Sequence, residues 1–344
     1  MPAFVPDILP ARPASAAHGI GIIGAGGIVQ HGHLPAYRKA GFSVIGLTSR
    51  TEETVTRTAD AWGVAWRGTD WRALLDLPAL TVVDVTYPFD EERLEIVREA
   101  AARGKHILMQ KPLAHSRETA AEMVRLAADA GVKLAVNQNA RWCPQYRAAW
   151  QAIREGWVGE VYFLLHEMLN TQDSQAWFAA RWYAQQPRFQ LLEYAVHHLD
   201  LLRFWTGQEP TRVTTSVGRK PTQQTVGEML ASVTLEFPGG TLAVAIEDNA
   251  AHPDATPRSR FRLEGTRGVL SGEAMGDPHL TLVSDRLPAP VTPDLPGTWF
   301  PDAFIGTMGE LLRAIEEDRE STISGADNLK TLEIVFQAYE SAGL

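Results

Sequence analysis

The sequence predicts two consecutive α/β domains, a doubly wound parallel sheet followed by an open, mostly antiparallel sheet with helices. Three observations support this fold class. A glycine-rich turn joins an apolar strand to a helix within residues 18–31. Strands and helices then alternate up to about residue 139, which is typical of a parallel sheet. From residue 211 onward strands follow one another with little helix between them, which favours antiparallel pairing.

Length and composition are those of a globular protein of two domains. The chain has 344 residues, of which 45% are hydrophobic and 21% charged. The net charge of −9 is spread along the chain, which argues against nucleic acid or an anionic membrane as a partner. No apolar run approaches the roughly 18 residues of a membrane span. The single cysteine, Cys143, excludes an internal disulfide and favours a reducing, cytoplasmic setting.

Elements of the first domain follow from apolar runs and capping residues. We expect residues 1–17, rich in proline and alanine, to be a disordered lead-in, because they lack the basic start and apolar core of a signal peptide. The first domain then covers residues 18–139. Asp90 and Ser116 are typical helix N-caps. After the first strand we expect strands at 43–48, 64–65, 81–86, 106–109 and 133–137, and helices at 32–40, 52–62, 70–77, 90–104 and 116–131.

The second domain is expected to cover residues 140–344. Alternate positions of one strand, Leu242, Val244 and Ile246, are apolar on the side that should face outward. This predicts a sheet face that is buried against another subunit, in a homodimer or homotetramer. We expect helices at 144–155 and 191–205, strands at 160–169, 213–217, 228–237, 241–247, 261–265, 268–271 and 280–283, and final helices at 302–317 and 325–342 that pack back on the first domain.

The glycine-rich turn has the composition of a phosphate-binding loop. Gly24 can turn the chain where a Cβ would clash, and Gly26 lets backbone N–H groups approach a pyrophosphate. The helix that begins behind Gly27 and Ile28 favours the negative charge. Val29 stands where the motif usually has Gly or Ala, so a turn without a ligand is the alternative. A second strand about 20 residues further on favours dinucleotide binding.

Four segments occur in order along the chain: the turn at 24–28, the strand that ends at Pro88, the segment Gly-Lys-His-Ile-Leu-Met-Gln-Lys-Pro at 104–112, and a helix with Glu193, His197, Asp200 and Gly207. Together they resemble the Gfo/Idh/MocA oxidoreductases, named after glucose-fructose oxidoreductase and inositol dehydrogenase. The Lys-Pro and histidine motifs are specific in combination. The resemblance covers about residues 18–344, and it implies a Rossmann domain for NAD(P) followed by a substrate-binding domain.

Lys111 follows a strand of the predicted parallel sheet, at the edge where ligands bind in such folds. The resemblance implies that Lys111 contacts the nicotinamide ribose and a substrate hydroxyl. A solvated surface lysine is the alternative. The family usually has Glu before this lysine, whereas this chain has Gln110, so a carboxylate that would tune the pKa of the lysine is absent.

Glu193, His197 and Asp200 are spaced four and three residues apart and form a polar stripe on an otherwise apolar helix. The resemblance implies that His197 exchanges a proton with the substrate hydroxyl, work that suits the ordinary imidazole pKa of ~6.5. Glu193 is one methylene longer than the family's usual Asp. A structural hydrogen-bond network is the alternative. Glu193 and His197 could also bind a metal ion, but no third ligand is evident in the sequence, so we predict no metal site. His198 faces another side of the helix.

Ser49 and Arg50 follow the second strand, where an NAD site usually has an acid for the ribose 2′-OH. Without that carboxylate a 2′-phosphate is not repelled, and Arg50 is able to pair with it or stack on adenine. The cofactor is therefore expected to be NAD(P), with a slight preference for NADP.

Three further segments depart from the family pattern or extend it. Tyr87 and Pro88 belong to a segment that replaces the usual Thr-Pro-Asn, so Tyr87 is expected to cover the nicotinamide. The resemblance places Arg141 and Trp142 near cofactor and substrate, although Arg141 could instead anchor the domain junction. The aromatic loop that contains Arg181 suits a polyhydroxylated ring, or nearly as well a dimer interface.

Together these residues predict an NAD(P)-dependent dehydrogenase that transfers hydride to or from a sugar, cyclic polyol or sugar acid. The alternatives are an isomerase, epimerase or lyase with transient redox, and a non-catalytic nucleotide-binding sensor. Retention of both Lys111 and His197 speaks against the sensor. The predicted catalytic residues are Lys111, His197 and Glu193; the substrate-binding residues are Lys111, Trp142, Arg181, Glu193 and His197; the cofactor-binding residues are Gly24, Gly26, Gly27, Ile28, Ser49, Arg50, Tyr87, Pro88, Gln110, Lys111 and Arg141.

Overall fold

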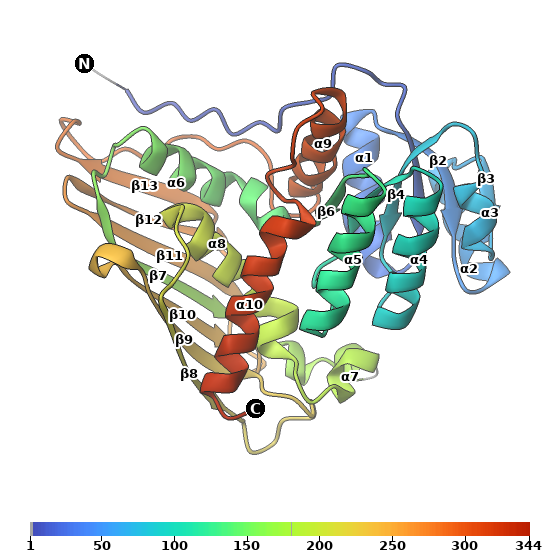
Figure 1. The fold of residues 1–344 in the computed structure, drawn as a ribbon. Helices are drawn as coiled ribbons and strands as arrows, with labels where there is room; N and C mark the ends of the chain where they lie inside the picture. Colours follow the sequence, from blue (N-terminus) through green and yellow to red (C-terminus); the bar gives the residue numbers. More distant parts are fainter. Residues whose placement is uncertain (1–2, 180) are drawn as a thin grey trace. The chain divides into compact units, whose positions relative to one another are not determined.

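The computed structural model describes residues 3–179 and 181–344, which contain two sheets with their helices (Figure 1). The chain divides into two compact units. The parallel-sheet unit comprises Leu9–Trp142 and Thr298–Leu329. The mixed-sheet unit comprises Cys143–Gly297 and Lys330–Leu344, together with the start of the chain up to Ile8. Both units are therefore assembled from segments that lie far apart in the sequence.

Six parallel strands form the first sheet in the order β3-β2-β1-β4-β5-β6, as the alternation of strands and helices predicts. All five residues of β1 are buried, because β1 pairs with β2 on one side and with β4 on the other. The strand order reverses at β1, which creates a switch point at its C-terminal end. The strands are β1 (Gly19–Ile23), β2 (Ser43–Thr48), β3 (Trp66–Gly68), β4 (Leu80–Val85), β5 (His106–Met109) and β6 (Leu134–Val136).

Of the two helix caps expected in the parallel-sheet unit, one is confirmed and the other is wrong. Ser116 accepts a hydrogen bond from the backbone N–H of Thr119 at the start of α5. Asp90 is the first residue of α4 rather than its cap, and its carboxylate instead binds the backbone and side-chain nitrogens of His115 at 2.7 Å each. The helices are η1 (Val29–His33), α1 (Leu34–Ala40), α2 (Glu52–Trp62), α3 (Trp71–Leu75), α4 (Asp90–Ala102), α5 (Arg117–Asp129), η2 (Asn139–Trp142) and α9 (Ala303–Glu316).

Seven strands form the second sheet in the order β13-β12-β11-β7-β10-β9-β8. Its neighbours pair antiparallel except β7 and β10, which run parallel. The predicted open, mostly antiparallel sheet is confirmed. The strands are β7 (Val161–Leu169), β8 (Arg212–Gly218), β9 (Leu230–Glu236), β10 (Leu242–Asp248), β11 (Arg258–Gly265), β12 (Gly268–Met275) and β13 (His279–Ser284).

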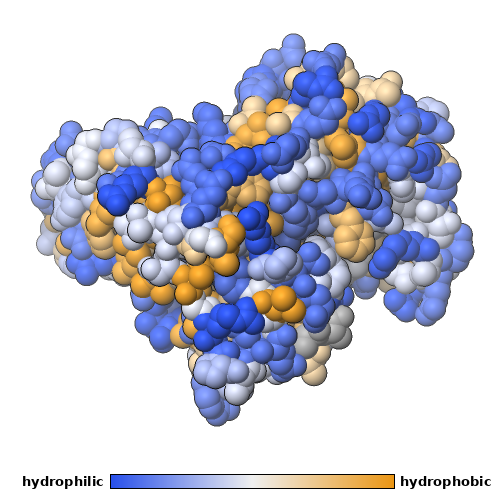
Figure 2. All heavy atoms as spheres, turned by 60° about the horizontal axis from the view of Figure 1, so that its bottom comes forward, coloured by the Kyte–Doolittle hydropathy of each residue, from blue (hydrophilic) through white to orange (hydrophobic). Residues whose placement is uncertain are grey.

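One face of this sheet is covered by helices and the other is open. Ala243, Ala245 and Glu247 of β10 are buried on the covered face, whereas Leu242 and Ile246 are 37% and 40% exposed on the other. In Figure 2, hydrophobic residues are gathered toward the left of the view, the side on which this sheet lies in Figure 1. The helices are α6 (Pro144–Arg154), η3 (Gln172–Ser174), α7 (Ala176–Ala179), η4 (Trp182–Gln185), η5 (Gln190–Ala195), α8 (Val196–Thr206), η6 (Pro238–Gly240) and α10 (Gly325–Ser341).

In the described part of the chain, no helix combines the length and the apolar character that crossing a membrane requires.

The start of the chain makes defined contacts, which differs from the expected disordered lead-in. Phe4 and Ile8 are buried, and the ring of Phe4 packs edge-on against Trp157 with 5.7 Å between centroids. Further along, the backbone N–H groups of residues 14 and 15 donate to the carboxylate of Glu316 at 2.7 and 2.8 Å. Burial of two apolar side chains holds a segment that contains neither helix nor strand. Residues 1 and 2 of the expected lead-in lie outside the described residues.

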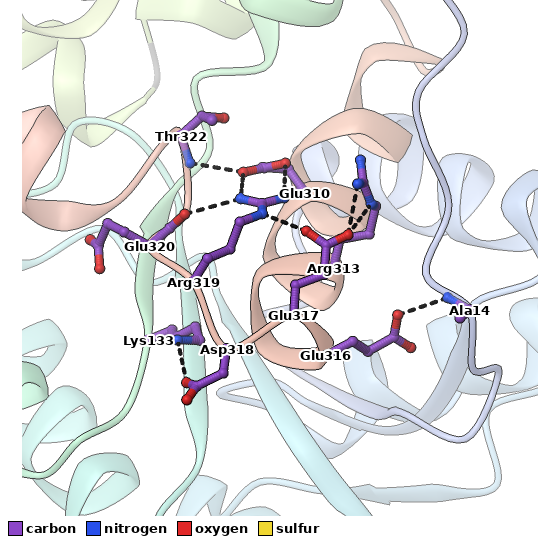
Figure 3. A network of polar contacts seen from close by, with 10 residues as sticks. All are labelled: Ala14, Lys133, Glu310, Arg313, Glu316, Glu317, Asp318, Arg319, Glu320 and Thr322. Carbon is purple, nitrogen blue, oxygen red and sulfur yellow. Dashed lines mark hydrogen bonds and ion pairs between the residues drawn. The ribbon is translucent and has the colours of Figure 1, made fainter.

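Glu310 on α9 is the centre of a polar network at the end of that helix (Figure 3). Its carboxylate accepts two N–H bonds from Arg319, at 2.7 and 3.0 Å, and one from the backbone of Thr322, at 2.8 Å. Burial would raise the pKa of Glu310, but the hydrogen bonds from Arg319 and Thr322 outweigh burial and lower it. The network therefore ties the end of α9 to the loop that leads to α10.

We expect Arg319→Met to lower the free energy of unfolding by about 1–3 kcal/mol at pH 7, because Glu310 loses a bidentate partner. A carboxylate whose pKa is lowered by folding stabilises the protein above its ordinary pKa, and this contribution is lost as pH falls through the lowered value. The difference from wild type should therefore shrink below about pH 4.

Denaturant unfolding at pH 7 and pH 3 measures this effect. Arg57→Met is the control, because Arg57 and its partner Glu53 have side chains that are 63% and 86% exposed. An equal loss of stability at both pH values would contradict a role for the ionised Glu310.

Candidate active site

The glycine-rich turn lies at the C-terminal end of β1. Gly24 has φ of +117°, and a Cβ there would lie 2.1 Å from Oγ1 of Thr86, so only glycine fits. A Cβ on Gly26 or Gly27 would meet no atom within 4 Å, so both residues face open space. The N–H of Val29 donates to the carbonyl of Gly26 at 3.1 Å, and the helix begins there. The turn therefore offers the close backbone approach that a pyrophosphate requires.

A cavity of about 250 Å³ opens beside this turn, between the loops that follow β1, β2 and β4. These loops meet at the switch point of the sheet, the place where doubly wound folds bind ligands. The cavity brings together the predicted residues Gly24, Gly26, Ile28, Ser49, Arg50, Tyr87 and Pro88. Its lining also includes Ala25, Thr51, Thr54 and Thr86, which the sequence reasoning missed. Thr51 and Thr86 follow strand ends, and Thr54 lies in the first turn of α2.

The end of β2 supplies hydroxyl groups and a guanidinium to the cavity. Ser49 donates its backbone N–H to the carbonyl of Gly68 at 3.3 Å, and Arg50 is exposed. The hydroxyl of Thr51 caps α2 by accepting from the backbone N–H of Thr54. The residues that line the described cavity include Arg50 and no carboxylate, so the lining beside the end of β2 carries a positive charge.

Lys111 follows β5 by two residues, and its half-buried side chain belongs to the parallel-sheet unit. Gln110 turns inward instead of lining the described cavity. Its side-chain oxygen accepts from the backbone N–H of Lys111 at 3.2 Å and from Nδ2 of Asn137 at 2.9 Å. Nδ2 of Asn137 also lies 3.4 Å from Nε2 of His33, whose Nδ1 lies 2.6 Å from the carboxylate of Asp84. Gln110 thus supports the backbone of Lys111 and belongs to a series of buried polar contacts. This geometry does not favour the contact with the cofactor that was predicted for Gln110.

Arg93 joins two loops of the site, and sequence reasoning missed it. The side chain is 3% exposed on α4. Its Nε donates to the carbonyl of Tyr87 at 2.5 Å, and its terminal nitrogen donates to the carbonyls of Pro112 and Leu113. Arg93 shares one face of this helix with apolar residues, at the spacing of Ile96, Val97 and Ala100. A charged residue on an apolar helix face is the sequence signal that could have identified Arg93. The guanidinium holds the loop after β4 to the loop that carries Lys111.

Arg141 and Trp142 have structural partners inside the parallel-sheet unit. Arg141 is 4% exposed, donates to the carbonyl of Thr322 at 2.6 Å and pairs with Asp327 at 2.8 Å. Trp142 packs so closely on α9 that a Cβ on Gly306 would lie 2.0 Å from its ring. These contacts favour the anchoring alternative for Arg141. The predicted approach of these two residues to cofactor and substrate stays a prediction.

The helix with His197 begins with a π-helical turn, η5, and continues as α8, where a uniform helix was expected. Glu193 lies in the π-helical turn and His197 in the first turn of α8, and both are half-buried. Asp200 is fully buried and accepts from the hydroxyl of Thr331 at 2.8 Å. π-Helical turns are rare and occur frequently at functional sites. The predicted polar stripe therefore divides into an accessible pair and a structural carboxylate.

Two buried carboxyl groups hold the start of this helix. Glu228 accepts from the backbone N–H groups of Phe189, at 3.2 Å, and Leu191, at 3.0 Å. Glu247 accepts from Nε2 of Gln190 at 3.0 Å, and its other oxygen lies 2.6 Å from Nδ1 of His198. Glu228 acts as the N-cap, since η5 has no side-chain cap from its own flanking residue.

His166, His198 and Glu247 form a buried cluster whose possible ligand atoms lie within 4.8 Å of one another. The two imidazole rings are stacked, with centroids 4.0 Å apart and planes inclined by 22°. An ion bound to an imidazole lies in the ring plane about 2.0–2.1 Å from nitrogen, so stacked rings cannot share one. The direct contact between His198 and Glu247 also leaves no room for an ion. The cluster is a hydrogen-bonded stack rather than a metal centre.

The remaining predicted residue, Arg181, is exposed in the mixed-sheet unit. Its guanidinium lies 5.9 Å from the ring centre of Trp177, which is 52% exposed. Glu193, His197 and Arg181 thus belong to the mixed-sheet unit, whereas Lys111 and the cavity belong to the parallel-sheet unit.

A glycine-rich turn beside a cavity at the switch point of a doubly wound sheet is typical of a dinucleotide-binding protein. The family model described as "Oxidoreductase family, NAD-binding Rossmann fold" matches residues 18–138, and the GFO/IDH/MocA C-terminal domain matches residues 146–271. The chain belongs to the Gfo/Idh/MocA family of oxidoreductases, which confirms the resemblance stated from the sequence.

Relatives and solved structures extend this match over nearly the whole chain. D-apiose dehydrogenase of Paraburkholderia graminis is 27% identical, over 92% of this chain and 85% of that protein. Inositol 2-dehydrogenase of Rhizobium meliloti is 23% identical, over 93% of this chain and 96% of that protein. An oxidoreductase from Agrobacterium radiobacter, solved with NAD+, L-tartaric acid and magnesium, is 22% identical and superposes with a TM-score of 0.83, over 95% of this chain and 96% of that one. It shares the fold.

We expect Gly24→Ala to lower the free energy of unfolding by about 1–3 kcal/mol, because the new Cβ clashes with Thr86 at a positive φ. Gly26→Ala should leave stability near wild type, since its Cβ enters open space, but should weaken nucleotide binding by filling the pyrophosphate position. Thermal melts and fluorescence titration with NADH and NADPH separate the two effects. Wild-type nucleotide affinity in Gly26→Ala would show that this cavity does not hold the cofactor.

Proposed function

We propose that the protein is an NAD(P)-dependent dehydrogenase that oxidises a hydroxyl group, or reduces the corresponding carbonyl, of a sugar, cyclic polyol or sugar acid. The observation that carries this proposal is the open glycine cradle at the switch point, together with the family to which the chain belongs. Relatives that bear the names D-apiose dehydrogenase, 1,5-anhydro-D-fructose reductase and inositol 2-dehydrogenase support a polyhydroxylated substrate.

Each residue of the proposed site has a distinct task. When bound, the nicotinamide supplies the hydride acceptor. The backbone at Gly26 and Gly27 holds the pyrophosphate, while Tyr87 and Pro88 line the cavity on the side of β4. The imidazole of His197 takes the proton of the substrate hydroxyl. The ammonium group of Lys111 stabilises the negative charge that develops on that oxygen.

Glu193 and Arg181 are proposed to contact the substrate from the mixed-sheet unit. The half-buried carboxylate of Glu193 lies four residues before His197, so it can accept a neighbouring substrate hydroxyl. Exposed Arg181 and Trp177 offer donors and an aromatic face, which suit a polyhydroxylated ring.

NADP is proposed as the preferred cofactor. The cavity has Ser49, Arg50, Thr51 and Thr54 at the end of β2, where an acid would bind a ribose 2′-OH. Hydroxyl groups and a guanidinium suit a 2′-phosphate, because both donate hydrogen bonds to its oxygens.

The lone buried Cys143 supports a cytoplasmic setting.

The open face of the mixed sheet is proposed to pair with a second copy of the chain, in a homodimer or homotetramer. This face carries five apolar residues on the adjacent strands β7 and β10, together with one acid, Glu167, in register with Ile246; the apolar residues are Phe163, Leu165, Leu242, Val244 and Ile246. A contiguous apolar face of this kind favours burial against another subunit.

The first test follows the absorbance of reduced nicotinamide, with NAD+ or NADP+ and a panel of sugars, inositols and sugar acids. We expect turnover with one class of compound. His197→Asn and Lys111→Ala should each lower kcat by ~10²–10⁴-fold, because each removes a group that acts on the substrate oxygen. Nucleotide affinity should remain close to wild type, since neither side chain holds the pyrophosphate.

Lys39→Ala is the control, because Lys39 is 61% exposed in the same unit as Lys111. Wild-type turnover in Lys111→Ala would reject its assignment. A flat absorbance trace from wild-type protein that binds nucleotide would instead favour transient redox or a sensor.

We expect Arg50→Asp to shift the ratio of kcat/KM values for NADP+ and NAD+ toward NAD+ by at least about tenfold, or ~1.4 kcal/mol. The carboxylate repels a 2′-phosphate and can accept the ribose 2′-OH. Steady-state kinetics with both cofactors measure the ratio. Arg57→Asp on α2 controls for the change in net charge, and an unchanged ratio in Arg50→Asp would exclude Arg50 from cofactor discrimination.

A further inference from the structure

Glu247 holds the helix that carries Glu193 and His197 at two points. It is 1% exposed on the covered face of β10. One oxygen accepts from Nε2 of Gln190, the first residue of η5, at 3.0 Å, and the other lies 2.6 Å from Nδ1 of His198, the third residue of α8. Glu193 and His197 therefore lie between the two points at which one carboxyl group holds the helix.

The groups around Glu247 favour a neutral carboxyl group. The titratable side chains that face it are His166 on β7, His198 on α8 and Tyr146 on α6. Burial raises the pKa of Glu247 to about 8 and lowers the pKa of His198 to about 3, and it also lowers the pKa of His166. A neutral Glu247 is able to donate its O–H to Nδ1 of His198, while its other oxygen accepts from Nε2 of Gln190.

A π-helical turn contains one residue more than the α-helical turn it replaces, so it depends on tertiary contacts. Its relaxation to α-helix would shift the register by one residue, which rotates a side chain by about 100°. Such a rotation would turn Gln190, at the start of η5, relative to His198 on α8, and these are the two residues that Glu247 holds. The stacked ring of His166 and the packing of β10 resist this shift from the sheet side.

We propose that Glu247 is a positioning residue for the reaction proposed above, because its two oxygens hold Gln190 and His198, on either side of Glu193 and His197, and thereby fix the direction in which the helix presents these two side chains. This inference rests on the proposed function, in which Glu193 and His197 meet the substrate. Glu247 itself has no contact with the reacting atoms in this proposal.

The test compares Glu247→Gln with Glu247→Leu. An amide preserves both hydrogen bonds of the neutral carboxyl group, since its NH2 donates to His198 and its oxygen accepts from Gln190. We therefore expect Glu247→Gln to keep kcat at pH 7 near wild type. Leucine has a similar size but no hydrogen bonds, so kcat should fall by ~10–100-fold. Nucleotide affinity should not change in either variant, because the cofactor cavity belongs to the other unit.

The pH profile supplies a second readout. Above its raised pKa the carboxyl group carries a charge that burial disfavours, so the stability that the neutral group gives to this arrangement is lost as pH rises through that value. Wild-type kcat should therefore fall above about pH 8, the value to which burial raises the pKa of Glu247, whereas Glu247→Gln should stay level there. Equal declines in both proteins, or equal activity of Glu247→Leu and wild type, would overturn the proposal.

Two further variants separate positioning from loss of the fold. Gln190→Leu removes the contact with Glu247, together with the hydrogen bond that Gln190 accepts from Nδ2 of Asn249 at 2.9 Å, and it should lower kcat without changing nucleotide affinity. Glu236→Leu is the matched control, because Glu236 lies on the neighbouring strand with a side chain that is 47% exposed. Full activity in Gln190→Leu would contradict the proposal. Inactivity of the wild-type protein toward every substrate would instead reject the proposed function.

Discussion

The close approach of β1 to β4 is the constraint on which the cofactor site depends. At the end of β1 the chain passes so near Thr86 that the residue there can have no side chain, and Gly24 meets this condition at a positive φ. The chain then turns into a helix and leaves open space above Gly26 and Gly27. Because the strand order reverses at β1, the loops after β2 and β4 flank the same space. One steric condition thus locates the cavity and selects the loops that line it.

Strands and helices were predictable from the sequence wherever neighbouring residues determine where they begin and end. Strands at 43–48 and 106–109 were expected with the bounds they have, because apolar runs end at evident turns. The strand expected at 64–65 lies instead at Trp66–Gly68, since the N–H of Val64 closes the end of α2 on the carbonyl of Ala59. The parallel pairing of β7 with β10 was not predictable, because residue alternation carries no information on which distant strand is the neighbour.

Site residues with a local sequence signal were likewise predictable, whereas contacts between distant residues were not. Gly24, Ser49 and Tyr87 follow strand ends, and the cavity contains them. The partners of Arg141 could not be predicted, because Thr322 and Asp327 lie about 180 residues further along the chain. The contacts of Glu247 with the π-helical turn were missed for a similar reason, since burial of an acid on an alternating strand leaves no mark in the sequence.

Arg93 has a consequence for any attempt to alter the specificity of the enzyme. Its guanidinium binds main-chain carbonyl groups of two loops, so it recognises their paths rather than their side chains. Substitutions in either loop that keep the backbone course are therefore compatible with this arginine. An insertion or deletion in one loop would displace a carbonyl and disturb the other. For protein engineering, the two loops form a single module that should be exchanged together with the helix that bears Arg93.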